Sequence, residues 1–295
     1  MEWQFGDGIH DIKRCLRCSI VFVHGRPTGT ACQYDEAYFE QKYTDLTKSG
    51  YVNTEAARKR MLSCFQHAIS VCGSLNGRPG VVLDVGCGTG RFLELAQKEG
   101  WRAEGLEPFP GAAEDTGRRL GIRVYVGGVM EASLPSKSFD IITMFDVIEH
   151  LERPVDALQV CERSLKPGGV LILTTPNFNG LGRRLMGKDA FAIWPDEHLV
   201  YFKGSTLRRA LALGGFAKTE LSTREIYPEN VAMFLSRLNG QKQIISSRPT
   251  GSEESILAVK SAARGSVFVR LRSLANLLFE HVLWGDELLA FAKKA

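Results

Sequence analysis

The sequence of 295 residues lacks the long hydrophobic runs that are typical of membrane-spanning proteins. No apolar stretch approaches the roughly 20 residues that a helix needs to cross a bilayer, so we expect no transmembrane segment. The N-terminus also lacks a basic segment followed by an apolar core, which is the pattern of a secretory signal peptide. We therefore expect neither a signal peptide nor a spanning helix.

Blocks of lysine and arginine comparable to the basic arms of nucleic-acid-binding proteins are also missing, and the net charge is only +4. We therefore expect no nucleic-acid partner. The seven cysteines are an odd number and are scattered through an enzyme-sized chain, so they do not form the framework of a disulfide-rich secreted domain. This cysteine usage is typical of a reduced protein, and we expect a cytoplasmic location.

What the sequence does contain is a glycine-rich loop at residues 86–90. The apolar, β-branched run before it, residues 81–85, predicts a strand buried on both faces of a parallel sheet. Glycine stands at every second position of the loop, which lets the backbone turn tightly and approach a ligand. A helical pattern begins at Arg91, and the loop followed by a helix N-terminus predicts a place where backbone N–H groups favour an anion.

The glycine spacing separates two classes of ligand. The loop reads G-x-G-x-G and is followed by Arg91, so it does not match the dinucleotide fingerprint G-x-G-x-x-G. Asp84 lies just before the loop, where a carboxylate would repel a pyrophosphate but suits a ligand that carries an ammonium and a sulfonium. The stretch resembles motif I of the class I S-adenosylmethionine-dependent methyltransferases. The resemblance implies that the cofactor-binding residues include Asp84, Gly86, Cys87, Gly88 and Gly90.

Further cofactor residues are predicted along the following strands. Glu107 ends a second predicted strand, 23 positions beyond Asp84, where an acidic side chain can accept both ribose hydroxyls. Val129 and Met130 follow the third predicted strand, and we expect them to form apolar walls for the adenine ring. Asp146 ends the fourth predicted strand and is expected beside the methionyl end of the cofactor.

The region from residue 139 to residue 177 carries the most specific pattern. It combines FD, five residues, D-x-x-EHL, then LKPGG, then a strand that ends in TPN. This combination resembles the ubiquinone-biosynthesis-like methyltransferases. The alternation of strands and helices predicts an α/β fold with a doubly wound parallel sheet. The resemblance implies a Rossmann-like methyltransferase fold with seven mostly parallel strands and with N- and C-terminal additions.

Three parts of the chain are predicted: residues 1–50, a methyltransferase core at 51–225, and a C-terminal part at 226–295 whose last strand completes the core sheet. The first part contains the pair Cys15 and Cys18 and is similar to the zinc-ribbon-like segment of some methyltransferases. A structural zinc site needs four ligands. His10, His24 and Cys32 are candidates for the missing ones, but none repeats the knuckle spacing, and we expect no zinc here.

Two histidines are the candidate general bases for the transfer, since imidazole titrates near neutral pH. His150 follows the fourth predicted strand, and His198 lies in a loop whose aromatic residues Trp194 and Tyr201 could form walls of the acceptor site. A metal role for Glu149 and His150, by analogy with related O-methyltransferases, is an alternative, but we assign no metal ligand.

The sequence therefore predicts an S-adenosylmethionine-dependent methyltransferase that acts on a small molecule, with oxygen as the favoured acceptor atom. Methylation of nitrogen or carbon remains open, and so does a non-catalytic protein that binds the cofactor as a regulator or scaffold. An amphipathic pattern at residues 267–282 predicts a helix that could contact a membrane surface, a second copy of the chain, or its own domain.

Overall fold

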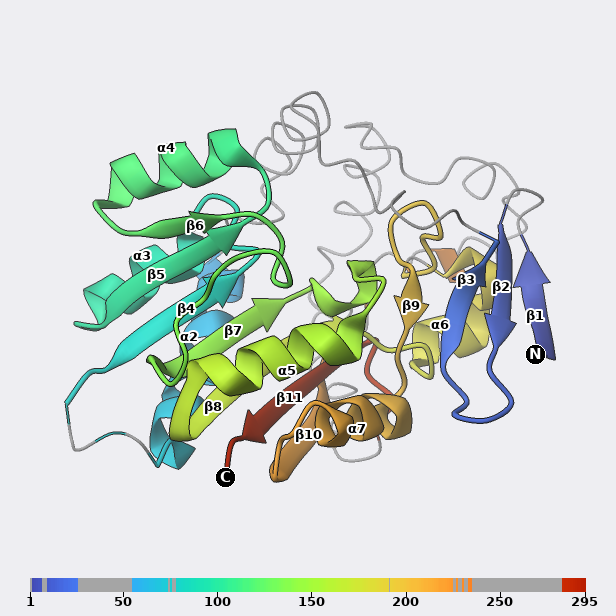
Figure 1. The fold of residues 1–295 in the computed structure, drawn as a ribbon. Helices are drawn as coiled ribbons and strands as arrows, with labels where there is room; N and C mark the ends of the chain where they lie inside the picture. The colour runs from blue at the N-terminus through green and yellow to red at the C-terminus, as the bar shows by residue number, and fades with distance from the viewer. Residues whose placement is uncertain are drawn as a thin grey trace.

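A computed structural model describes residues 2–6, 10–25, 55–73, 75, 78–190, 192–224, 227, 230, 233–234 and 283–295. Its centre is a seven-stranded sheet with helices on both faces (Figure 1). The sheet contains the strands β4 (Val81–Val85), β5 (Arg102–Glu107), β6 (Val124–Val126), β7 (Phe139–Phe145), β8 (Leu165–Pro176), β10 (Lys218–Arg224) and β11 (Glu287–Lys293). The predicted α/β class is therefore confirmed.

The strand order is β10-β11-β8-β7-β4-β5-β6. Strands β4 to β8 pair in parallel, whereas β11 runs antiparallel to both of its neighbours. The chain leaves β4 towards β5 and β6 on one side and returns to β7 and β8 on the other. The sheet is therefore doubly wound, and ligands of such sheets bind outside the carboxyl ends of the strands near this reversal.

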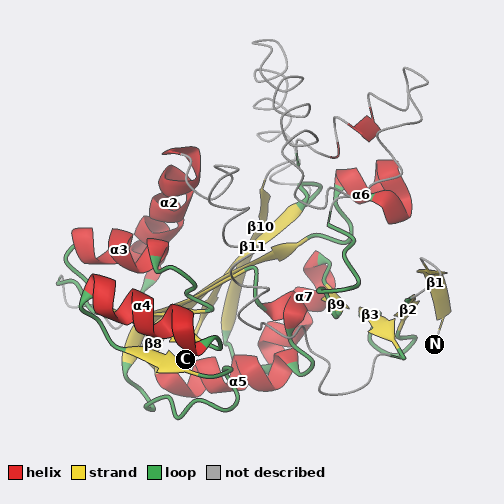
Figure 2. Cartoon of the chain, turned by 90° about the horizontal axis from the view of Figure 1, so that it is seen from above, coloured by secondary structure: helices red, strands yellow, loops and turns green. Residues whose placement is uncertain are grey.

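Helices cover the two faces of the sheet (Figure 2). One face packs against α2 (Glu55–Val71) and α3 (Arg91–Lys98), and the other packs against α5 (Pro154–Ser164) and α7 (Gly204–Leu213). Helix α4 (Pro110–Leu120) lies against β5 and β6. It begins at Pro110, whose fixed φ suits the first helical position, and ends at Gly121, whose φ of 65° is left-handed.

One predicted boundary is wrong. The sequence LKPGG was expected to end α5 before a strand that begins at Val170, but β8 starts at Leu165, because that residue already pairs with Phe139 across a bulge. Helix α5 does end before LKPGG, at Ser164, but this segment already belongs to the strand.

A second sheet stands beside the carboxyl edge of the first one. It contains β1 (Glu2–Gly6), β2 (Asp11–Arg14), β3 (Val21–His24) and β9 (Val200–Tyr201) in that order, all antiparallel. Figure 1 shows β9 between the N-terminal strands and the large sheet. Because β9 comes from the core region, the N-terminal strands are joined to the loop that contains His198.

Short elements complete the chain: η1 (Ile148–His150), α6 (Leu181–Met186) and η2 (Gly187–Asp189). The last strand, β11, confirms the predicted antiparallel strand at the C-terminus. The amphipathic pattern at 267–282 lies outside the described residues, so the predicted contact with a membrane or a second copy stays a prediction. Among the helices that the structure describes, none is long and apolar enough to cross a bilayer.

Candidate active site at the carboxyl edge of the sheet

The glycine loop at 86–90 connects β4 to α3 at the predicted edge of the sheet. All three of its glycines have positive φ. A Cβ at Gly86 would lie 2.6 Å from the side chain of Val147, so the loop approaches the segment after β7 too closely for a side chain. A Cβ at Gly88 would meet no atom within 4 Å. The backbone at Gly88 therefore faces open space that a ligand can fill.

The loop N–H groups do not form the anion site that the sequence predicts. Those of Gly86 and Cys87 both donate to the carbonyl of Leu106, at 2.8 and 3.1 Å, and that of Gly90 donates to the carbonyl of Cys87. The N–H of Gly88 donates to the Glu107 carboxylate at 2.9 Å. These donors are already used by the protein, so an anion at the loop is not what this geometry favours.

Glu107 ends β5 beside the loop, as predicted. Its carboxylate accepts the N–H of Gly88 with one oxygen and that of Phe109, at 3.1 Å, with the other. Each carboxylate oxygen has a second lone pair, so the orientation of the group is held while it can still accept hydroxyl groups. Burial raises the pKa of Glu107 above its ordinary value, partly offset by the two N–H donors.

Asp84 is buried within β4 and accepts the hydroxyl of Thr143 on β7 at 2.6 Å. Burial raises its pKa to about 7, and the Thr143 hydrogen bond opposes that shift. The Asp84 carboxyl therefore links two adjacent strands under the loop and is close to half-protonated at neutral pH. Its predicted contact with a cationic ligand remains a prediction.

Three of the other predicted cofactor residues are packed against the core. Cys87 is buried, and burial together with the charges of Asp84 and Glu107 raises the pKa of its thiol. Val129 is buried in the main core, with the half-buried Met130 packed against that core. Their loop is joined to β5, since the N–H of Gly127 donates to the Glu107 carbonyl.

Asp146 follows β7 with a left-handed φ of 53° and an exposed side chain. Its carboxylate accepts the Thr174 hydroxyl at 3.0 Å, and its N–H donates to the Thr174 carbonyl at 3.2 Å. The residue is therefore held at the carboxyl ends of two neighbouring strands, beside the segment that contains His150.

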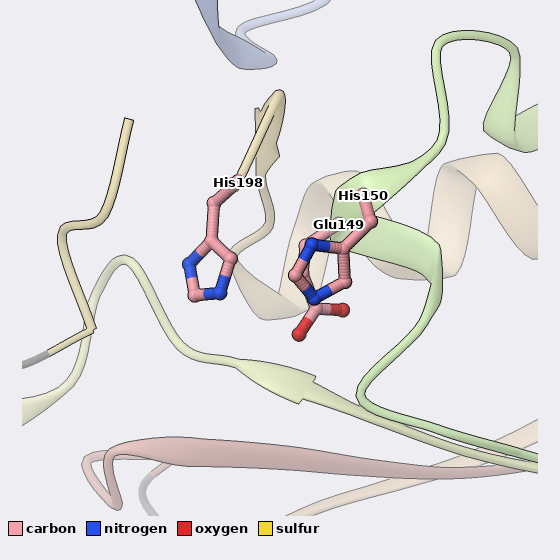
Figure 3. A group of neighbouring side chains, drawn as sticks. All are labelled: Glu149, His150 and His198. Carbon is pink, nitrogen blue, oxygen red and sulfur yellow. The ribbon is translucent and has the colours of Figure 1, made fainter. Parts of the chain in front are cut away.

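The structure brings the two predicted bases together with a third group (Figure 3). One side-chain atom each of Glu149, His150 and His198 lies within 4.8 Å of the others. The two imidazole rings are 4.9 Å apart between centroids, at an angle of 75°. The N–H of Leu199 donates to the Glu149 carbonyl at 2.8 Å, which connects the loop before β9 to η1.

Backbone carbonyls set the tautomer of both histidines. Nδ1 of His150 lies 3.0 Å from the carbonyl oxygen of Glu197, and Nδ1 of His198 lies 3.1 Å from that of Ala192. A carbonyl oxygen can only accept a hydrogen bond, so both Nδ1 atoms carry hydrogen in the neutral rings. The lone pair of each imidazole is then on Nε2, the atom that can take a proton or bind a metal.

Glu149 contributes a buried acid to this cluster. One carboxyl oxygen accepts the Thr175 hydroxyl at 2.9 Å, and the other is buried without a hydrogen-bond partner. Burial and the nearby charge of Asp146 raise its pKa well above the ordinary value. A buried carboxylate oxygen without a partner is costly, so this side chain favours a proton, an imidazolium or a cation beside it.

The predicted acceptor walls are adjacent to the cluster. The rings of Trp194 and Tyr201 lie 6.4 and 6.1 Å from the His198 ring. Tyr201 also packs with Phe178 and Ile12 in a small core under the N-terminal sheet. From the sequence, Glu149 was considered only as an alternative metal ligand, although the EHL motif that contains it could have indicated its place in the site.

The cysteine pair lies apart from this site, in the turn between β2 and β3. The backbone N–H groups of Cys18 and Arg17 lower the pKa of the Cys15 thiol. Among the described residues, no third cysteine, histidine or carboxylate comes within metal-binding distance of this pair. His24 accepts Lys13 Nζ at 3.0 Å, His10 lies 3.5 Å from Asp196, and Cys32 is outside the described residues.

Comparison with known proteins identifies the family. The sequence model of a methyltransferase domain matches residues 56–221, which is more than half of the chain. The ubiquinone biosynthesis O-methyltransferase of Vibrio cholerae is 35% identical over 107 residues, which are 33% of this chain and 42% of that protein. The Klebsiella pneumoniae protein of the same name is 36% identical over 115 residues, 37% of this chain and 46% of that protein. The chain thus spans less than half the length of these curated relatives.

Solved structures support the same fold. An S-adenosylmethionine-dependent methyltransferase of Thermotoga maritima, described as a possible histamine N-methyltransferase, has a TM-score of 0.53 and 18% identity, over 88% of this chain and 99% of that one. One from Archaeoglobus fulgidus has a TM-score of 0.51 and 22% identity, over 88% and 100%. The predicted Rossmann-like methyltransferase fold is confirmed, and the chain belongs to the methyltransferase-domain family.

Proposed function

We propose that this chain transfers a methyl group from S-adenosylmethionine to a hydroxyl oxygen of a small molecule. The observation that carries the proposal is the convergence of Glu149, His150 and His198 at the same sheet edge as the glycine loop. A site that only binds the donor has no need for a buried acid next to two histidines. The names of the curated relatives support oxygen as the acceptor atom.

The donor site fits S-adenosylmethionine. Glu107 is already oriented by two N–H donors to accept the ribose hydroxyls, and the open side of Gly88 leaves space for close approach. Asp84 can balance the net positive charge of the donor from beneath the loop. When bound, S-adenosylmethionine supplies a methyl group on a cationic sulfur, which an acceptor atom displaces in line. The protein must hold the two reactants at near-attack distance.

The histidine cluster removes the proton of the acceptor hydroxyl. An Nε2 lone pair of His150 or His198 accepts it, and the resulting imidazolium is stabilised by the Glu149 carboxylate. The Thr175 hydroxyl keeps one Glu149 oxygen in place, so the other oxygen can face the imidazolium. The backbone carbonyls of Glu197 and Ala192 keep the rings from presenting the wrong nitrogen.

The same three side chains are suitable ligands for a divalent cation, and the buried Glu149 oxygen without a partner fits such an ion. A cation would lower the pKa of a bound hydroxyl group and neutralise Glu149. The two mechanisms differ in one measurable property. If a histidine is the base, methyl-transfer activity survives dialysis against a chelator. If a cation is required, activity is lost on dialysis and is restored by added Mg²⁺, Mn²⁺ or Zn²⁺.

A methyl-release assay with labelled donor and a panel of catechols, phenols, sugars and amines tests the proposal. Transfer to hydroxylated members, lost in Glu149→Gln, supports it. Transfer to amines alone would replace it with N-methylation. Donor affinity in the micromolar range without transfer to any member would favour the regulatory or scaffold interpretation. A small molecule is the partner that this function requires, and the free thiols of the described cysteines support the predicted cytoplasmic location.

A further inference from the structure

Arg183 lies in the short helix α6, which follows the carboxyl end of β8 and therefore starts at the same sheet edge as the histidine cluster. Asp286 holds this helix in place, because its buried carboxylate accepts the N–H of Gly182 at 2.7 Å. A Cβ at Gly182 would overlap the Asn230 side chain, which also donates to Asp286. The backbone next to Arg183 is thus fixed from two directions.

The Arg183 guanidinium is half-buried, and no anion lies beside it among the residues that the structure describes. Its carbon lies 4.6 Å above the centre of the Phe178 ring, and its Nε atom is buried without a hydrogen-bond partner. Within the described part of the chain no carboxylate forms an ion pair with it, and the nearest influential charge is that of Arg184. Burial and this like charge lower the pKa of Arg183. A partly desolvated cation beside a second cation is unfavourable unless an anion binds there.

A row of aromatic rings connects Arg183 to the histidine cluster. Phe178, beneath the guanidinium, lies 5.6 Å from Tyr201, and Tyr201 lies 6.1 Å from His198. The distance from the guanidinium to the His198 ring is therefore at most the sum of these two ring distances and the 4.6 Å between the guanidinium carbon and the Phe178 ring.

We propose that Arg183 binds an anionic group, a carboxylate or a phosphate, on the acceptor whose hydroxyl reaches the histidine cluster. This inference rests on the proposed function, since it names the class of acceptor. The guanidinium is planar and presents parallel N–H donors that match two oxygens of a carboxylate or phosphate. Stacking on Phe178 keeps that plane fixed, and partial burial strengthens the charge interaction.

Arg184 provides a matched control on the same helix. It is exposed, its Nε donates to the Asn179 carbonyl at 3.0 Å, and its guanidinium lies 5.1 Å from the Trp284 ring. The two residues have the same charge and are neighbours in the sequence, but only Arg183 is on the buried face. A general effect of positive charge on the acceptor would involve both arginines.

The test is a calorimetric titration of the full chain saturated with S-adenosylhomocysteine. The probes are 3,4-dihydroxybenzoate, 3-(3,4-dihydroxyphenyl)propionate and 3,4-dihydroxybenzylphosphonate, and each is compared with its uncharged amide or ester. We expect at least one anionic probe to bind tenfold or more tightly than its neutral partner. Preference for the phosphonate over both carboxylates would identify a phosphate as the natural group, and the reverse would identify a carboxylate.

Arg183→Gln should abolish the preference for the anionic probe, Arg183→Lys should retain only part of it, and Arg184→Gln should leave it within twofold of wild type. If Arg183→Gln does not fold, the reduced preference of Arg183→Lys for the anionic probe is the result that tests the inference. The inference is overturned if no probe shows the preference, if Arg183→Gln retains it, or if Arg184→Gln loses it equally. The titration requires no turnover. Anion binding through Arg183 without methyl transfer would therefore contradict the proposed function and leave only the anion site at Arg183.

Discussion

Donor binding should release a proton from Asp84. In the free protein, burial raises the pKa of this carboxyl to about 7, and the Thr143 hydroxyl is its hydrogen-bond donor. S-adenosylmethionine carries a net positive charge, and an opposite charge within a few ångströms lowers the pKa of a carboxylic acid. Binding near the glycine loop should therefore convert Asp84 from a partly protonated group to a fully charged one.

The size of the effect follows from that pKa. At pH 6.5, a group with a pKa of 7 is about three-quarters protonated, so binding should release up to about three-quarters of a proton per chain. By linkage, donor affinity should rise about tenfold per pH unit well below pH 7 and become constant above it. S-adenosylhomocysteine, which lacks the sulfonium charge, should release fewer protons.

Calorimetric titration at pH 6.5 in three buffers of different ionisation enthalpy measures the released protons from the slope of the observed enthalpy. Asp84→Asn keeps an oxygen for the Thr143 hydroxyl and should remove most of the release. Glu107→Gln is the control for the other buried acid of the donor site, whose pKa burial also raises. No release in the wild type, or equal release in Asp84→Asn, would refute the placement of the donor charge beside Asp84.

Three further predictions concern the donor, the base and the buried acid. Glu107→Ala should weaken donor binding by about 1.5–3 kcal/mol, because a charge-assisted contact to the ribose is lost; unchanged affinity, or tight NAD binding, would contradict the ribose assignment. Replacing His150 or His198 by alanine should lower turnover by about 10²–10⁴-fold and leave donor affinity nearly unchanged. We expect the larger loss for His150. Near wild-type turnover in both variants would mean that neither histidine is the base. Glu149→Gln should abolish most turnover. The same variant should also raise the melting temperature relative to wild type, by an amount that grows with pH. The reason is that the pKa of Glu149 is raised in the folded state, so the wild type loses stability as the pH rises from about 4 through that raised pKa. A melting difference that is independent of pH would contradict the raised pKa of Glu149.

Much of the fold could be predicted from local sequence. The apolar run of β4, the three glycines after it and the proline and glycine that bound α4 each act within a few residues. Backbone sterics and burial of apolar side chains operate at that range, so strand, loop and helix could be placed without knowledge of the rest. The acidic end of β5 was also predictable, because the length of one strand–helix–strand unit sets its distance from Asp84.

Long-range pairing decided the rest. The start of β8 at Leu165 depends on Phe139, and the loop N–H groups are taken by Leu106 and Glu107 on the neighbouring strand. No local pattern encodes these partners, since they come from strands that are adjacent in space and distant in sequence.

The chemistry of the site shows the same division. The sequence alone established that His150, Glu149 and His198 are present and that the first two follow a core strand. Only the tertiary structure placed His198 against them, through the hydrogen bond between Leu199 and Glu149 and the pairing of β9 with the N-terminal sheet. The raised pKa of Glu149 and the lowered pKa of Arg183 are likewise products of burial. Burial depends on every element that packs around a group, so a residue's type is local information, whereas its protonation and its partners are properties of the whole fold.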